Sequence, residues 1–112
     1  MVIGVLETGE VRLYASLAAV MEEWRHYLSD LASDVIVLYD EDGTWLKAVE
    51  TYGRKWYQLR PRLMSVELRR ASEDEYHDSL GYLLKHEATT LASNPFVRSL
   101  EQLRQMYPWV ER

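Results

Sequence analysis

The sequence predicts one α+β domain over residues 1–112, with two layers and a mainly antiparallel sheet of about five or six strands. Three observations predict it: short β-branched runs in the first half, one amphipathic helical stretch between two of them, and helical periodicity in the last third. The helical stretch is expected to act as a crossover helix, and the end of the chain to form a helical pair. With 112 residues the chain can bury a core but leaves no room for a second domain.

The first segment predicts a β-hairpin. The apolar run 2–6 and the run 11–14 flank Glu7-Thr8-Gly9-Glu10, whose glycine can supply the positive φ of a tight turn. A single longer, bent strand is the alternative.

Residues 16–31 predict one amphipathic helix, with Ser16 as its N-cap. Its apolar residues recur at intervals of three and four, and polar residues occupy the other side. The helix is therefore expected to pack on the sheet through Leu17, Val20, Met21, Trp24, Leu28 and Leu31.

Two further strands are expected at 35–39 and 44–50, joined by a turn that contains Asp42-Gly43. The first of them is apolar on both faces, which is typical of a central strand. A third run, 63–69, alternates apolar and polar residues and predicts a half-buried strand.

The last third predicts two helices. Ser72 and Glu75 match a capping box, and the apolar stripe that follows contains Tyr76, Leu80, Leu83, Leu84, Ala88 and Leu91. Asn94-Pro95 predicts the start of a second helix, which ends before Pro108. This helix is expected to turn Phe96, Val97, Leu100, Leu103 and Tyr107 inward.

The composition argues against most kinds of catalytic site. The chain has no cysteine, which excludes disulfides, cysteine zinc sites and thiol nucleophiles. His77 and His86 are nine residues apart and fall on opposite sides of the expected helix, and the acidic turn at 40–43 does not fit a calcium-binding loop. We therefore expect no enzyme activity, no cofactor and no metal.

The sequence also indicates a cytoplasmic protein without membrane contact, because no apolar run exceeds about six residues. The net charge is −5, which makes nucleic acid an improbable main ligand. The charge is uneven: residues 1–53 contain ten acidic and three basic side chains, whereas residues 54–70 contain one and six. Such polarity favours selection of a charged partner.

The acidic residues supply the candidate partner-binding site. Asp40, Glu41 and Asp42 precede Trp45 and exceed what a turn needs. Eight tyrosines and four tryptophans against one phenylalanine also favour interfaces. Secondary candidates are Tyr52 and the acidic residues at the start of the expected helix, Glu73, Asp74 and Asp78. For these three, a favourable interaction with the helix dipole is an alternative explanation.

The basic segment gives an alternative function, a small nucleic-acid-binding or regulatory module. Its cations alternate with aromatic residues, as in grooves that bind single strands: Arg54, Lys55, Trp56, Tyr57, Arg60 and Arg62. A strand whose cationic flanks solvate a sheet edge explains the same pattern.

The N-terminal β segment, the helix 16–31, the acidic hairpin 35–46 and the helical C-terminus together resemble small acidic immunity proteins of bacterial toxin systems, including contact-dependent growth inhibition. The resemblance implies a cytoplasmic protein that binds one cognate toxin and has no catalysis of its own. A nuclease whose basic cleft is filled by acidic and aromatic side chains is the expected type of partner. Monomer and homodimer both stay open.

Overall fold

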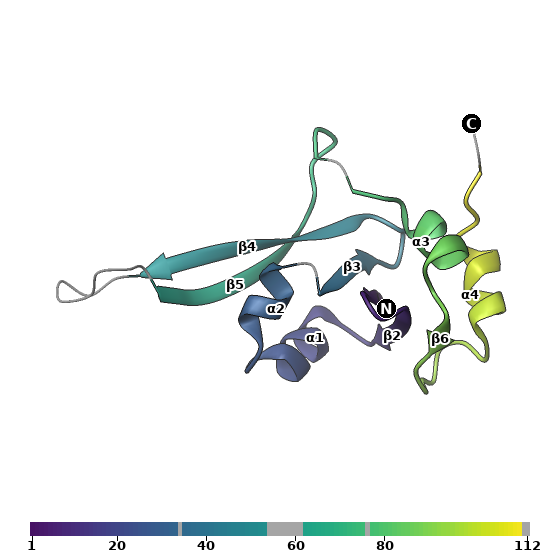
Figure 1. Ribbon diagram of the computed structural model, residues 1–112, viewed down its shortest axis with the longest axis horizontal. Helices are drawn as coiled ribbons and strands as arrows, with labels where there is room; N and C mark the ends of the chain where they lie inside the picture. Colours follow the sequence, from purple (N-terminus) through teal and green to yellow (C-terminus); the bar gives the residue numbers. More distant parts are fainter. Residues whose placement is uncertain (34, 54–61, 76, 111–112) are drawn as a thin grey trace.

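The structure, a computed structural model, describes residues 1–33, 35–53, 62–75 and 77–110. Its six strands form one sheet in the order β5-β4-β3-β1-β2-β6 (Figure 1). Neighbouring strands are antiparallel except β2 and β6, which are parallel. The strands are β1 (Val2–Leu6), β2 (Glu10–Tyr14), β3 (Ile36–Asp40), β4 (Trp45–Gly53), β5 (Arg62–Arg70) and β6 (Thr90–Leu91). The predicted α+β class and mainly antiparallel sheet are confirmed.

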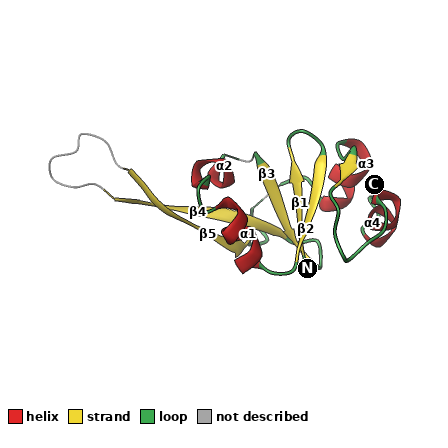
Figure 2. Ribbon diagram, turned by 90° about the horizontal axis from the view of Figure 1, so that it is seen from below, coloured by secondary structure: helices red, strands yellow, loops and turns green. Residues whose placement is uncertain are grey.

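In the described part of the chain, four helices accompany the sheet: α1 (Leu17–Trp24), α2 (Leu28–Ala32), α3 (Leu80–His86) and α4 (Leu100–Met106). They form two groups, with α1 and α2 on one side of strands β1 to β3 and the C-terminal pair α3 and α4 on the other (Figure 2). None of the helices in the described ranges has the length and apolar character that crossing a bilayer requires.

Each group of helices closes its own apolar core. Side chains alternate between the faces of β1, so that Ile3 and Val5 pack with α3 and α4, whereas Val2 packs with α1 and α2. The structure therefore has three layers, helices–sheet–helices, where two were expected. A central sheet that is apolar on both faces must be covered on both faces.

Both predicted hairpin turns are confirmed. Gly9 has φ 91° between β1 and β2, and Gly43 has φ 86° between β3 and β4. Only glycine adopts this region without strain, so each glycine marks the point at which the chain reverses.

The connection from β2 to β3 crosses β1, since both strands are antiparallel neighbours of β1. Ser16 caps α1 as predicted, and its Oγ accepts from the amide of Ala19 at 3.2 Å. The single helix expected over 16–31 is wrong, because Tyr27 leaves the helical conformation at φ −131° and ψ 45°. The break tips α2 toward β4 and β5, where Leu31 becomes buried.

The helix predicted from Ser72 begins seven residues later, behind Ser79, whose Oγ accepts from the amide of Tyr82 at 3.2 Å. The capping box fails because the Glu75 carboxylate binds Lys47 on β4 instead of the amide of Ser72. Tyr76, which was assigned to the apolar stripe of this helix, lies outside the described residues.

The start of the last helix is also later than predicted. Asn94 caps a turn, but α4 begins behind Ser99, whose Oγ accepts from the amide of Gln102 at 3.1 Å. Phe96 was expected inside and is 41% exposed, because residue 96 lies in the loop before the helix. Leu91 is expected on a helix but lies in β6, where it pairs with Val11 of β2.

The β4–β5 hairpin extends beyond the rest of the sheet (Figures 1 and 2). Among the described residues, β3 pairs with β4 at Leu38↔Leu46 and Tyr39↔Trp45, whereas β4 and β5 stay paired as far as Gly53↔Arg62. Val66 on β5 is buried and packs with the core under α1 and α2. The predicted strand 63–69 is confirmed within β5.

Candidate partner-binding surface

The end of the β3–β4 turn and the acidic segment before α3 meet at one depression of about 290 Å³, here called the acidic pocket; Asp40, Glu41 and Asp42 do not line it. Gly43, Thr44 and Trp45 line it from the β3–β4 turn. From the segment between β5 and α3 it is lined by Ala71, Ser72, Glu73, Glu75, His77, Asp78 and Ser79. Residues far apart in the sequence are thereby brought to a common surface.

Aromatic rings form part of the wall of the acidic pocket. The rings of Trp45 and His77 lie 4.9 Å apart at an interplanar angle of 36°. The buried hydroxyl of Tyr39 donates to the carbonyl oxygen of Asp78 and lies 3.3 Å from Nδ1 of His77. These contacts hold the segment before α3 against the sheet, and they place Trp45 in a half-buried position.

Glu75 is a carboxylate of the pocket that binds two basic side chains. Its Oε1 accepts from Nη2 of Arg69 at 3.0 Å and from Nζ of Lys47 at 3.2 Å. The Arg69 bond first, and then the Lys47 bond, lower the pKa of Glu75 below its ordinary value. Its Oε2 is buried, and no described residue donates to it, so this oxygen can accept a further hydrogen bond.

Two carboxylates of the turn at 40–42 are already bound within the protein, and the sequence gives no sign of this. Arg70 donates to Oδ2 of Asp40 at 3.2 Å and to Oδ2 of Asp42 at 2.6 Å. The Thr44 amide bond to Asp42, at 2.9 Å, and then the Arg70 bond lower the pKa of Asp42 to about 2. Both carboxylates are therefore held to the end of β5.

Three carboxylates remain open to a partner. The side chain of Glu41 is 69% exposed, and its nearest described cation is the N-terminal amine at 4.0 Å. Glu73 and Asp74 are exposed, and no basic side chain of the described part forms an ion pair with them. The hydroxyl of Tyr107 donates a hydrogen bond to the carbonyl of Glu41. Burial first, and then the negative charges of the turn at 40–42, raise the pKa of Tyr107.

Part of the predicted site falls outside the described residues: Arg54, Lys55, Trp56, Tyr57 and Arg60. Tyr52 lies in β4 opposite Leu63, and Arg62 lies in β5 opposite Gly53, but the side chains of Tyr52 and Arg62 are not described. The basic segment thus stays a prediction from the sequence.

A second pocket, of about 250 Å³, lies on the other face of the sheet and is not expected from the sequence. Its aromatic part is Trp24 with Tyr27, whose rings meet edge to face at 6.4 Å. Arg12, Glu23 and Asp30 complete the lining. Tyr27 is 58% exposed because the helix breaks there, and a periodicity that continues through the break gives no sign of it.

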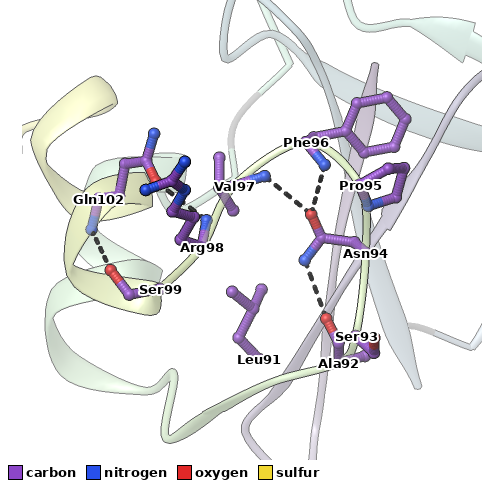
Figure 3. A pocket seen from close by; sticks show the side chains of 10 residues that line it. All are labelled: Leu91, Ala92, Ser93, Asn94, Pro95, Phe96, Val97, Arg98, Ser99 and Gln102. Carbon is purple, nitrogen blue, oxygen red and sulfur yellow. Dashed lines mark hydrogen bonds between the residues drawn. The ribbon is translucent and has the colours of Figure 1, made fainter.

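A third depression, of about 480 Å³, lies beside the loop between β6 and α4 (Figure 3). The side chain of Asn94 organises this loop by accepting from the amides of Phe96 and Val97, both at 2.9 Å, and donating to the carbonyl of Ala92. These hydrogen bonds are all made within the loop, so the depression is explained by the course of the turn.

Within the described ranges, no three His, Asp or Glu side chains lie close enough to hold a metal ion. Comparisons with protein-family models, with curated proteins and with solved structures found no match.

Proposed function

We propose that this protein binds a positively charged protein at the acidic pocket, and that it acts as an immunity protein that neutralises a bacterial toxin. In this proposal it occludes a basic cleft of the toxin, as the resemblance of the sequence implies. The observation that carries the proposal is the meeting of Trp45, at the end of the β3–β4 turn, with the carboxylate-bearing segment before α3 in one pocket.

A basic side chain of the partner is the group that fits this pocket. A lysine or arginine entering it would meet carboxylates beside aromatic rings. The exposed carboxylates of Glu41, Glu73 and Asp74 would attract the partner from a distance. Association is therefore expected to slow as salt rises, while apolar burial maintains the complex.

The test uses the toxin domain encoded next to this protein, identified by co-purification and by the growth arrest that it causes alone. Reversing two exposed charges, E73K with D74K, should weaken toxin binding about tenfold or more, mainly through the association rate. The control variant, E7K with E87K, changes the net charge equally at exposed sites outside the pocket.

Asp40 and Asp42 are poorer choices for this test, because their reversal would also break the bonds to Arg70. Equal binding by the pocket variant and its control would remove the assignment of the surface. Failure of the protein to restore growth in the presence of the toxin would remove the immunity role itself.

A further inference from the structure

The two edges of the sheet differ in length. In the described part of the chain, β5 ends the sheet on one side with nine residues, whereas β6 ends it on the other with two (Figure 1). A short edge offers little for another strand to pair with, but a long one presents a row of unpaired backbone groups.

The register shows which backbone groups of β5 point outward. The amide of Ala71 donates to the carbonyl of Trp45 at 2.9 Å, which makes these two residues a hydrogen-bonded pair. Such pairs alternate along antiparallel strands, so Arg69 and Glu67 also bond toward β4. The residues that alternate with them point their backbone groups away from β4: Val66, Leu68 and Arg70.

The side chains along this edge have a self-complementary order of charge. Glu67 and Arg69 are both exposed, are two residues apart, and lie on the same face of β5. Leu68 lies on the other face, where it packs against the core under α1 and α2. An edge strand whose exposed side chains all had the same charge would repel a second copy of itself in every register. The order of opposite charges on β5 does not.

We propose that two copies of this chain associate through the open edge of β5, antiparallel about a two-fold axis at Leu68. Each Glu67 then faces the partner's Arg69, and the two Leu68 side chains meet on the opposite face. The outward backbone groups of Leu68 bond to those of the partner copy. The carbonyl of Arg70 accepts one bond from Nη1 of Arg69 at 3.3 Å, which leaves its second lone pair for the partner strand.

The neighbouring registers are less favourable. An axis at Glu67 sets two glutamates opposite each other, and an axis at Arg69 sets two arginines opposite each other. An axis at Val66 removes the pairing between Glu67 and Arg69 and places Arg70 opposite the partner's Arg62. The charges therefore select the axis at Leu68.

Charge reversal with complementation tests both the edge and the register. In E67R two arginines face each other, and in R69E two glutamates do, so each variant should dimerise at least about tenfold more weakly than the natural chain. In an equimolar mixture, every opposed pair is again of opposite sign, and heterodimers should form. Sedimentation velocity up to near-millimolar protein measures the dimer, and native mass spectrometry identifies the mixed species.

The control is E50R, which makes the same change of charge as E67R on β4, away from the edge, and should leave the dimer intact. Circular dichroism of each variant verifies its fold, which matters for R69E because Arg69 also binds Glu75. The proposal is overturned if the natural chain is monomeric throughout, including the case in which the edge pairs only with a strand of another protein. It is also overturned if the single variants dimerise normally or if their mixture stays monomeric.

Discussion

The hydroxyl of Tyr14, on β2, donates a hydrogen bond to the carboxylate of Glu23, on α1. The same oxygen accepts from Nε1 of the buried Trp24 at 3.2 Å. One phenol thus satisfies a helix carboxylate and an indole donor, and it ties the crossover connection to the sheet.

Tyr14→Phe should lower the free energy of unfolding by about 1 to 3 kcal/mol, because it leaves the buried indole N–H of Trp24 without an acceptor. Urea unfolding measures the loss. Tyr27→Phe, at an exposed phenol, is the control and should have almost no effect. Equal stability of the two variants would contradict the role given to the Tyr14 hydroxyl.

Tyr14 also predicts a dependence on alkaline pH. Burial first, and then the bond to Glu23, raise its pKa from 10.0 to about 12. The folded state favours the neutral phenol, so this stabilisation is fully present below pH 10 and is lost as pH rises toward 12. Ultraviolet titration should show one tyrosine that ionises at a higher pH than the others, and this tyrosine should be missing in Tyr14→Phe. If it is still present in the variant, the raised pKa belongs to another tyrosine.

The turn at 40–42 predicts a dependence on acid pH. The pKa of Asp42 is about 2 in the folded protein, below its ordinary 3.8, so its contribution to stability is present above pH 4 and lost as pH falls toward 2. Asp42→Asn should be less stable than the natural chain near neutral pH, and the difference should vanish near pH 2. Denaturant midpoints across this range measure it, and Glu41→Gln is the exposed control.

Gly81 predicts a steric effect at the C-terminal pair. A Cβ at this position of α3 would lie 2.7 Å from the carbonyl oxygen of Tyr107 and 2.9 Å from the amide nitrogen of Trp109. Alanine normally stabilises a helix relative to glycine by about 0.5 to 1 kcal/mol, but here it would push backbone away.

Gly81→Ala should therefore destabilise the protein by about 1 to 3 kcal/mol in urea unfolding. Gln105→Ala, at an exposed position of α4, should cause little change. A stabilised Gly81→Ala would mean that the segment after α4 does not pack on α3 as described.

The sequence was sufficient for those parts of the fold that depend on local chemistry. Gly9 and Gly43 marked both turns, and the alternation within 63–69 marked β5. It was insufficient at Tyr27, because hydrophobic periodicity reports which residues face the sheet and not whether one axis continues. Leu28 and Leu31 do reach the core, but from a second helix.

The candidate site was predictable as charge but not as geometry. Asp42 was recognised from its neighbours in the sequence, whereas its partner Arg70 is 28 residues away and reaches it only across the sheet. The same holds for Glu75, which appeared to cap a helix until Lys47, also 28 residues away, was brought beside it by the strand pairing. Local rules cannot rank a cap against an ion pair between distant segments.

The loop before α4 gives a last prediction, which separates the two roles of one amide side chain. Asn94 accepts from the amides of Phe96 and Val97 and donates to the carbonyl of Ala92 (Figure 3). Asn94→Ala removes all three bonds and should cost about 1 to 2 kcal/mol in urea unfolding. Asn94→Asp keeps the acceptor but loses the donor, so its stability should fall between those of the alanine variant and the natural chain. Ser93→Ala, at the exposed preceding residue, is the control. An aspartate variant no better than alanine would show that the bond to Ala92, and not the two accepted bonds, holds the loop.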